Sequence, residues 1–200
     1  MPNPPATLDA LARIGWQGTL PAEEDGTRIA RVIAQHRAGY ELHDGTTAFN
    51  AQPAPRFLKP DVGPEARPAV GDFVRVTPAK PPLIEAILPR RSLLERAAAG
   101  ERHRRQLIAA NIDTVMIVCG LDGDFNPARI ERYLLLVEGS GARACVVLTK
   151  ADLVSQVNTF VQLQNLMSYP FVAERVKSGK LRLHAWWFDR SHLRSISMGR

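Results

Sequence analysis

The tetrapeptide Thr149-Lys150-Ala151-Asp152 directly follows residues 144–148, an apolar run typical of a strand buried on both faces of a sheet. A carboxylate at Asp152 can accept hydrogen bonds from the ring N1–H and the exocyclic amine of guanine. Adenine offers no donors in that arrangement and would leave the acid unpaired. The alkyl stem of Lys150 can lie along the base. We therefore predict that the four residues recognise guanine; an ordinary surface loop is the alternative for so short a pattern.

The segments before this tetrapeptide predict a strand-helix-strand unit. Residues 114–118 are a β-branched apolar run that leads into the loop 120–124, and loops at the carboxyl ends of parallel strands are where α/β proteins place ligands. Asn126 precedes Pro127, the order expected of a helix N-cap and first helical residue. The run at 144–148 then brings the tetrapeptide to the same edge of the sheet.

The residues before this unit predict a small β barrel. Short alternating apolar runs begin at Thr27, a His43-Asp44-Gly45 turn separates two of them, and a further run ends at Pro89. About five short strands with glycine and proline between them fit a closed barrel of the OB type over residues 27–89. Residues 1–26, rich in proline and alanine, are predicted to be a flexible N-terminal arm.

The net charge of +6 is unevenly distributed along the chain. Residues 156–200 carry seven Lys or Arg against two acidic residues. Residues 90–106, predicted as a basic linker, hold six arginines against two glutamates. The paired N–H donors of a guanidinium group suit contacts with phosphate, so this linker is a candidate RNA-binding surface. A charged face that is only solvated is the alternative. The arginines are Arg90, Arg91, Arg96, Arg102, Arg104 and Arg105.

The cysteines and the overall hydropathy exclude other classes of protein. Cys119 and Cys145 each lie in an apolar run, so they are expected to be small core residues that form neither a disulfide nor a zinc site. No stretch reaches the roughly 18 consecutive apolar residues of a membrane span, and the N-terminus lacks a signal-peptide pattern. We therefore expect a cytoplasmic protein that does not associate with membranes.

Four passages resemble, in order and spacing, the ribosome small-subunit-dependent GTPase A family over about residues 28–152. They are residues 84–91 (IEAILPRR), 108–113 (IAANID), 124–134 (DFNPARIERYL) and 146–152 (VVLTKAD). The resemblance implies an OB barrel, a circularly permuted P-loop GTPase domain and a C-terminal zinc-binding region. It also implies GTP or GDP as ligand and a role in small-subunit maturation, with the small ribosomal subunit and 16S rRNA as partners rather than DNA. By position, Thr149, Lys150, Ala151 and Asp152 would hold guanine, and Arg90, Arg91, Arg104 and Arg105 would lie near ribosomal RNA.

The sequence departs from this family after Asp152. Residues 153–200 contain neither a GxxxxGK[ST] phosphate loop nor a Cys/His cluster for zinc. We therefore expect a partial GTPase domain over residues 107–153, truncated after the guanine motif, with weak or absent binding of GTP or GDP because the phosphate cradle is missing. We also expect no catalytic residues, no metal ligands and no GTPase activity alone. Residues 162–189 instead resemble the C-terminal segment of β-class carbonic anhydrases, whose zinc ligands have no counterpart here. This predicts an α+β tail over residues 154–200, in which a strand at 186–188 would lack its native sheet.

Three interpretations of function remain open from the sequence. The first is a small-subunit biogenesis GTPase that is not hydrolytically competent by itself. The second is a non-enzymatic RNA- or ribosome-binding OB module in which the tetrapeptide is a relic. The third is a non-functional fusion with a carbonic anhydrase fragment, arising from a real fusion or from a sequence artefact.

Overall fold

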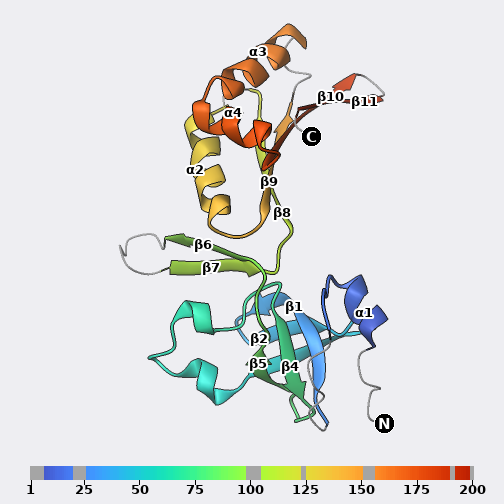
Figure 1. Ribbon diagram of the computed structural model, residues 1–200. Helices are drawn as coiled ribbons and strands as arrows, with labels where there is room; N and C mark the ends of the chain where they lie inside the picture. The colour runs from blue at the N-terminus through green and yellow to red at the C-terminus, as the bar shows by residue number, and fades with distance from the viewer. Residues whose placement is uncertain are drawn as a thin grey trace. The chain divides into compact units, whose positions relative to one another are not determined.

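A computed structural model describes residues 7–19, 26–97, 105–122, 125–150, 156–189 and 192–198. The chain divides into two compact units, Met1–Ile112 and Asp113–Arg200 (Figure 1). The first unit is built mainly from antiparallel strands and the second from a largely parallel sheet with helices. This division confirms the predicted order of a barrel followed by an α/β domain.

The first unit contains a closed barrel with strand order β1-β2-β3-β5-β4. Neighbouring strands are antiparallel except for β3 and β5, which pair in parallel. The residues that alternate inward along the strands are buried in one core that includes Val32, Leu42, Val74 and Ile84. The period-two pattern visible in the sequence therefore forms the barrel interior. The strands are β1 (Arg28–His36), β2 (Gly39–His43), β3 (Ala48–Pro53), β4 (Phe73–Thr77) and β5 (Leu83–Ile87).

Helix α1 (Leu8–Arg13) packs on this barrel. Leu11 in the helix is fully buried, and the ring of Trp16 lies edge-on to Phe73, with 4.8 Å between the ring centroids. A flexible arm was predicted for residues 1–26, whereas residues 8–16 are held against the barrel because these apolar side chains are buried there. Two short 3-10 helices, η1 (Pro55–Leu58) and η2 (Pro64–Ala66), connect β3 to β4.

Residues 90–106, predicted as a basic linker, overlap a two-stranded antiparallel sheet. It consists of β6 (Leu93–Ala97) and β7 (Arg105–Ala110). The backbone of β7 is joined to the barrel by a hydrogen bond from the amide of Ala110 to the carbonyl of Val70, at 2.8 Å. Strand pairing in this segment therefore places some of the arginines on a regular ladder.

The second unit holds a four-stranded sheet in the order β11-β10-β9-β8. Strands β8 (Thr114–Gly120), β9 (Arg143–Thr149) and β10 (Leu181–Asp189) are parallel, and β11 (His192–Met198) is antiparallel to β10. Helix α2 (Pro127–Glu138) connects β8 to β9. Its N-cap is Asn126, whose side chain accepts a hydrogen bond from the Arg129 amide at 3.0 Å, so the predicted strand-helix-strand unit and its cap are confirmed.

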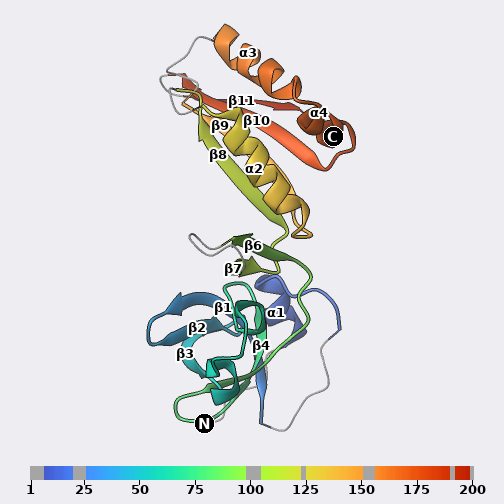
Figure 2. The ribbon, with the colours of Figure 1, turned by 90° about the vertical axis from the view of Figure 1, so that its left-hand side faces the viewer.

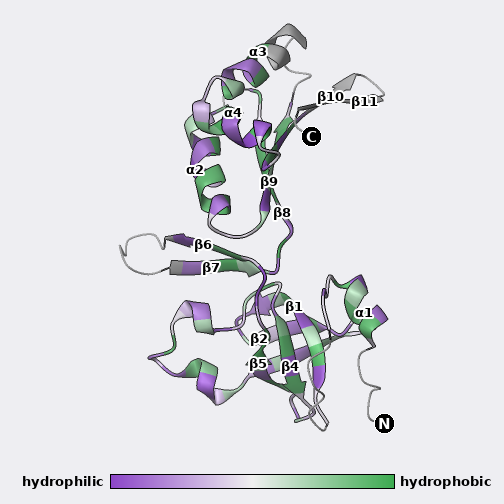
Figure 3. Cartoon of the chain, viewed as in Figure 1, coloured by the Kyte–Doolittle hydropathy of each residue, from purple (hydrophilic) through white to green (hydrophobic). Residues whose placement is uncertain are grey.

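Helices α2, α3 (Gln156–Met167) and α4 (Pro170–Lys177) gather on one face of this sheet (Figures 1 and 2). Along β8, Ile117 and Cys119 are buried, whereas Met116 and Val118 are 62% and 60% exposed. Successive strand residues point to opposite faces, so the helices cover the face of Ile117. Figure 3 shows both hydrophobic and hydrophilic residues along α2, whose buried residues are Ile130, Leu134 and Val137.

The segment after residue 153 is part of this second sheet. Leu181 and Leu183 of β10 pair with Ala144 and Val146 of β9, and all four are buried. The expectation that a strand at 186–188 would be left without its sheet is therefore wrong, because residues 186–188 pair with residues 193–195 of β11 and residues 181–185 of the same strand pair with β9. No boundary between compact units falls near residue 153.

Candidate nucleotide-base site

The carboxyl edge of the second sheet brings two loops together. Gly120, the last residue of β8, is the register partner of Thr149, the last residue of β9. The amide of Leu121 also donates to the Thr149 carbonyl at 2.9 Å. Residues 146–148 just before are buried. The tetrapeptide therefore begins where a buried parallel strand ends, at the edge where α/β proteins bind ligands.

Lys150 turns the chain sharply at this edge. Its φ is +58°, in the left-handed region that non-glycine residues seldom adopt. Its Nζ lies 2.5 Å from Oδ2 of Asp122, which follows β8. This ion pair joins the loop after β8 to the tetrapeptide and fixes the direction of the lysine stem.

Gly120 makes room for this contact. A Cβ at this position would lie 2.7 Å from Oδ1 of Asp122 and 3.4 Å from Cδ of Lys150. The first distance is too short for two non-bonded atoms, so a side chain here would displace the Asp122 carboxylate. The absence of a side chain at Gly120 thus allows the close approach of the two loops.

Asp122 is a site residue that sequence reasoning missed. The loop 120–124 was predicted to lie at the ligand edge, but no role was given to its acidic residue. The side chains of Lys150 and Asp122 are 53% and 27% exposed, and pairs this accessible contribute about 0.2–1 kcal/mol. The pair therefore orients Lys150 more than it stabilises the fold. Ala151 and Asp152 lie outside the described residues, so their contacts with guanine remain predictions.

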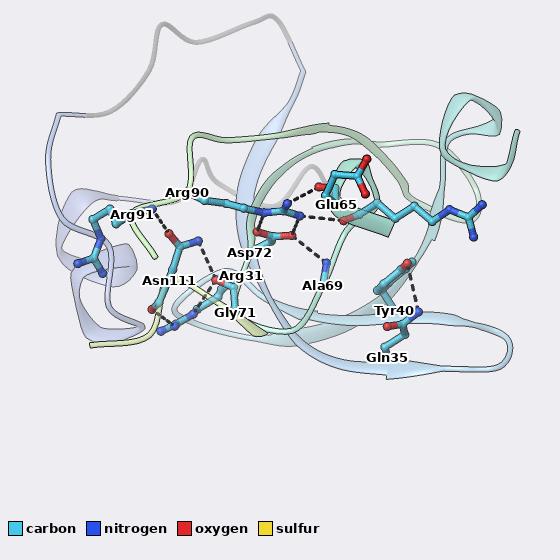
Figure 4. Close-up of polar contacts among 11 residues, drawn as sticks. Arg31, Gln35, Tyr40, Glu65, Ala69, Gly71, Asp72, Arg90, Arg91 and Asn111 are labelled. Carbon is cyan, nitrogen blue, oxygen red and sulfur yellow. Dashed lines mark hydrogen bonds and ion pairs between the residues drawn. The ribbon is translucent and has the colours of Figure 1, made fainter. Parts of the chain in front are cut away.

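Of the arginines predicted to contact RNA, Arg90 is bound inside the first unit (Figure 4). Its Nε and Nη2 donate to the two carboxylate oxygens of Asp72 at 2.7 and 2.6 Å. Nη2 also donates to the Arg67 carbonyl at 2.8 Å, and Nη1 donates to the carbonyl of Glu65. Asp72 is fully buried and accepts the Ala69 amide at 2.8 Å. Most donors of Arg90 are thus committed to the fold, which leaves it poorly suited to bind a phosphate.

Asn111 is a second polar residue that the sequence did not reveal. It is buried, with φ +53°. Its side chain accepts the Arg91 amide at 2.9 Å and donates to the Gly71 carbonyl at 3.1 Å, while its own carbonyl accepts Nη2 of Arg31 at 3.0 Å (Figure 4). Asn111 therefore ties together three segments that are distant in sequence.

The other three predicted RNA contacts are described to different extents. Arg91 is exposed and its Nη1 donates to Oε1 of Gln17 at 2.9 Å. Arg105 begins strand β7, of which the backbone is described at this position, and Arg104 lies outside the described residues. Of the four arginines, the side chains of Arg90 and Arg91 are described, and they have different hydrogen-bond partners.

Among the described residues, no group of three or more His, Cys, Asp or Glu side chains is placed to hold a metal ion. Helices long and apolar enough to cross a membrane are also absent from the described ranges. Cys119 and Cys145 are both free thiols.

A closed β barrel followed by a largely parallel sheet with helices on one face defines the architectural class of this chain. Comparison with known families specifies this class further. The family model described as RsgA GTPase matches residues 87–191, more than half of the chain. The chain belongs to the RsgA GTPase family, and the resemblance seen in the sequence is confirmed.

Individual proteins agree with this assignment. The small ribosomal subunit biogenesis GTPase RsgA of Xanthomonas euvesicatoria pv. vesicatoria is 47% identical over 163 residues, which are 76% of this chain. The structure of YjeQ from Thermotoga maritima matches with a TM-score of 0.51 at 20% identity, over 71% of this chain and 48% of YjeQ. YloQ, described as a circularly permuted GTPase, matches with a TM-score of 0.50 at 20% identity, over 74% of this chain and 50% of YloQ. These two structures support the fold alone.

The extent of the matches bears on the predicted junction near residue 153. The chain spans 44% and 41% of the length of two curated relatives. The family match continues past residue 153 to residue 191. The segment that resembles a carbonic anhydrase, residues 162–189, therefore lies entirely inside the family match, and that second resemblance stays a prediction.

Proposed function

We propose that this chain binds guanine nucleotide through residues 149–152 and contacts ribosomal RNA, as part of a small ribosomal subunit biogenesis GTPase. The observation that carries the proposal is the placement of Lys150, braced by Asp122 at the carboxyl edge of the parallel sheet. A lysine stem held in one direction can lie along a flat base without losing much freedom on binding.

Asp152 supplies specificity in this proposal. Its carboxylate would accept the N1–H and the exocyclic amine of guanine, and hydrogen bonds to a charged group are worth about 1.5–3 kcal/mol each. Adenine would leave the same carboxylate without donors. Discrimination between the two bases thus depends on one side chain and can be tested by one substitution.

Contact with the small subunit rests on charge and on relatives. The chain carries a net charge of +6, and the relatives are named as small ribosomal subunit biogenesis GTPases. Phosphate contacts supply much of the affinity of proteins for nucleic acids. We propose 16S rRNA as the partner. Exposed arginines such as Arg91 are the proposed contacts, and Arg104 and Arg105 are further candidates. Arg90 is not included, because it donates its hydrogen bonds to Asp72.

Hydrolysis is a separate matter from binding. Phosphoryl transfer needs a phosphate loop and bound magnesium, and a GxxxxGK[ST] motif does not occur in these 200 residues. We expect the 200-residue polypeptide to bind guanine nucleotide without hydrolysing it.

A fluorescence titration with labelled GDP and labelled ADP tests the proposal. GDP should bind and ADP should not, and Asp152→Asn should weaken GDP binding by about 10- to 100-fold, since asparagine keeps one acceptor oxygen and one charge-assisted hydrogen bond of about 1.5–3 kcal/mol is lost. Asp113→Asn is the matched control. It makes the same chemical change at an exposed residue that directly precedes the first residue of β8, at the end of the strand away from the base site. Equal binding of GDP and ADP, or full binding by Asp152→Asn, contradicts the proposal. Salt-dependent RNA binding without any nucleotide binding would favour the RNA-binding module instead.

A further inference from the structure

The amino edge of the second sheet carries a small basic pocket of about 190 Å³. Thr114 and Arg143, the first residues of β8 and β9, are register partners and line it. Lys180, directly before β10, and Arg182 within β10 line it as well. The beginnings of three parallel strands thus bring three cationic side chains to one hollow.

The electrostatics of this pocket favour an anion. Arg143, Lys180 and Arg182 are exposed, and the described part of the chain records no ion pair for any of them. The other titratable lining residues are His184 and Cys145. Burial raises the pKa of the Cys145 thiol, although Arg182 beside it acts to lower it, so the thiol adds no negative charge near neutral pH.

The neighbouring acid does not neutralise this charge. Asp113 precedes β8, and its backbone carbonyl accepts the Arg143 amide at 3.0 Å. One carboxylate against three fixed cations leaves the amino edge positive. Arginine forks match the oxygens of phosphate in geometry, and a guanidinium gives up its hydration more readily than an ammonium does.

The pocket is too distant from the base site to serve the same nucleotide. Strand β8 runs from Thr114 at the amino edge to Gly120 at the carboxyl edge. Six residue steps at about 3.3 Å each give about 20 Å, which exceeds the length of a nucleoside diphosphate. An anion held at the amino edge therefore belongs to a different molecule.

We propose that Arg143, Lys180 and Arg182 form a second anion site, which binds backbone phosphates of RNA at the edge of the sheet opposite the base site. This inference rests on the proposed function insofar as RNA is the partner. A free phosphate ion shares the same chemistry, and the two sources are separated by experiment.

The test is a salt series of fluorescence-anisotropy titrations with a labelled RNA hairpin. Each of Arg143→Gln and Arg182→Gln should make the negative slope of log affinity against log salt shallower by about 0.7–0.9, the value for one lost phosphate contact. Arg132→Gln is the control, since Arg132 is an exposed residue of helix α2 that does not line the pocket. An equal change in slope with Arg132→Gln would show an effect of net charge alone and overturn the inference.

Two further measurements identify the ligand and separate this inference from the proposed function. RNA should slow the alkylation of Cys145 by iodoacetamide, and inorganic phosphate should do so only at much higher concentration, because one phosphate ion lacks the other contacts of the RNA backbone. Phosphate binding without any change in RNA slope would assign the pocket to a small anion and refute the RNA contact. Arg143→Gln and Arg182→Gln should bind GDP with the affinity of the wild type. If the wild type binds GDP but the salt slopes for RNA are the same in the variants and the wild type, this inference fails and the proposed nucleotide recognition is unaffected.

Discussion

Asp122→Asn tests whether the brace on Lys150 matters for nucleotide binding. The substitution keeps the size of the side chain but removes the charge that lies 2.5 Å from the lysine Nζ. Because both side chains are partly exposed, the free energy of unfolding should fall by less than about 1 kcal/mol. The released lysine must be ordered when the base binds, which costs about 0.5–1.5 kcal/mol. We therefore expect GDP to bind about two- to tenfold more weakly.

The assay is the labelled-GDP titration at low and high salt, with circular dichroism to establish that the fold is retained. The deficit should shrink at high salt, because screening weakens the exposed ion pair in the wild type. Asp122→Glu should recover part of the affinity, and Glu131→Gln, on helix α2, should leave it unchanged. Wild-type affinity in Asp122→Asn, with the fold intact, would refute the role assigned to this pair.

Two predictions concern the barrel. Asp72→Ala leaves the guanidinium of Arg90 without its carboxylate partner in a buried setting, so urea unfolding should show a loss of about 3–5 kcal/mol; a loss below about 1 kcal/mol would contradict this. Burial raises the pKa of Asp44. Hydrogen bonds from two backbone amides and the charge of Arg28 lower it by more than burial raises it, so the pKa falls below the ordinary value of about 3.9. The stability from Asp44 is thus fully present above about pH 4 and lost as the pH falls through the lower folded pKa, and Asp44→Asn should reduce this loss in acid unfolding curves.

The sequence predicted the parts of this fold that depend on local periodicity. Alternation along β1 and β4 follows from residues two positions apart, so the barrel was visible without knowledge of pairing. The Asn126 cap and the strand before Thr149 were equally local. These features agree because each depends on residues within a few positions of one another.

Long-range polar partners could not be predicted in this way. Lys150 and Asp122 are 28 residues apart, and Arg90 and Asp72 are 18 residues apart. Strand β10 was assigned to a separate tail because that segment resembles a carbonic anhydrase. Its pairing with β9 joins residues that are 37 apart in sequence and leaves no local pattern. The charge of Arg90 was visible in the sequence, but the partner that determines its role was not.

The contrast between Arg90 and Arg182 gives a physical criterion for choosing among the many arginines of this chain. Arg90 binds a carboxylate that is fully buried, and breaking that pair would leave an unpaired charge in the barrel. Arg182 is exposed beside a pocket whose lining contains no carboxylate. A phosphate that approached Arg90 would have to compete with Asp72, whereas one that approached Arg182 would meet no carboxylate in the pocket lining. Proximity in sequence to other arginines therefore says less about RNA contact than the identity of the nearest acid does.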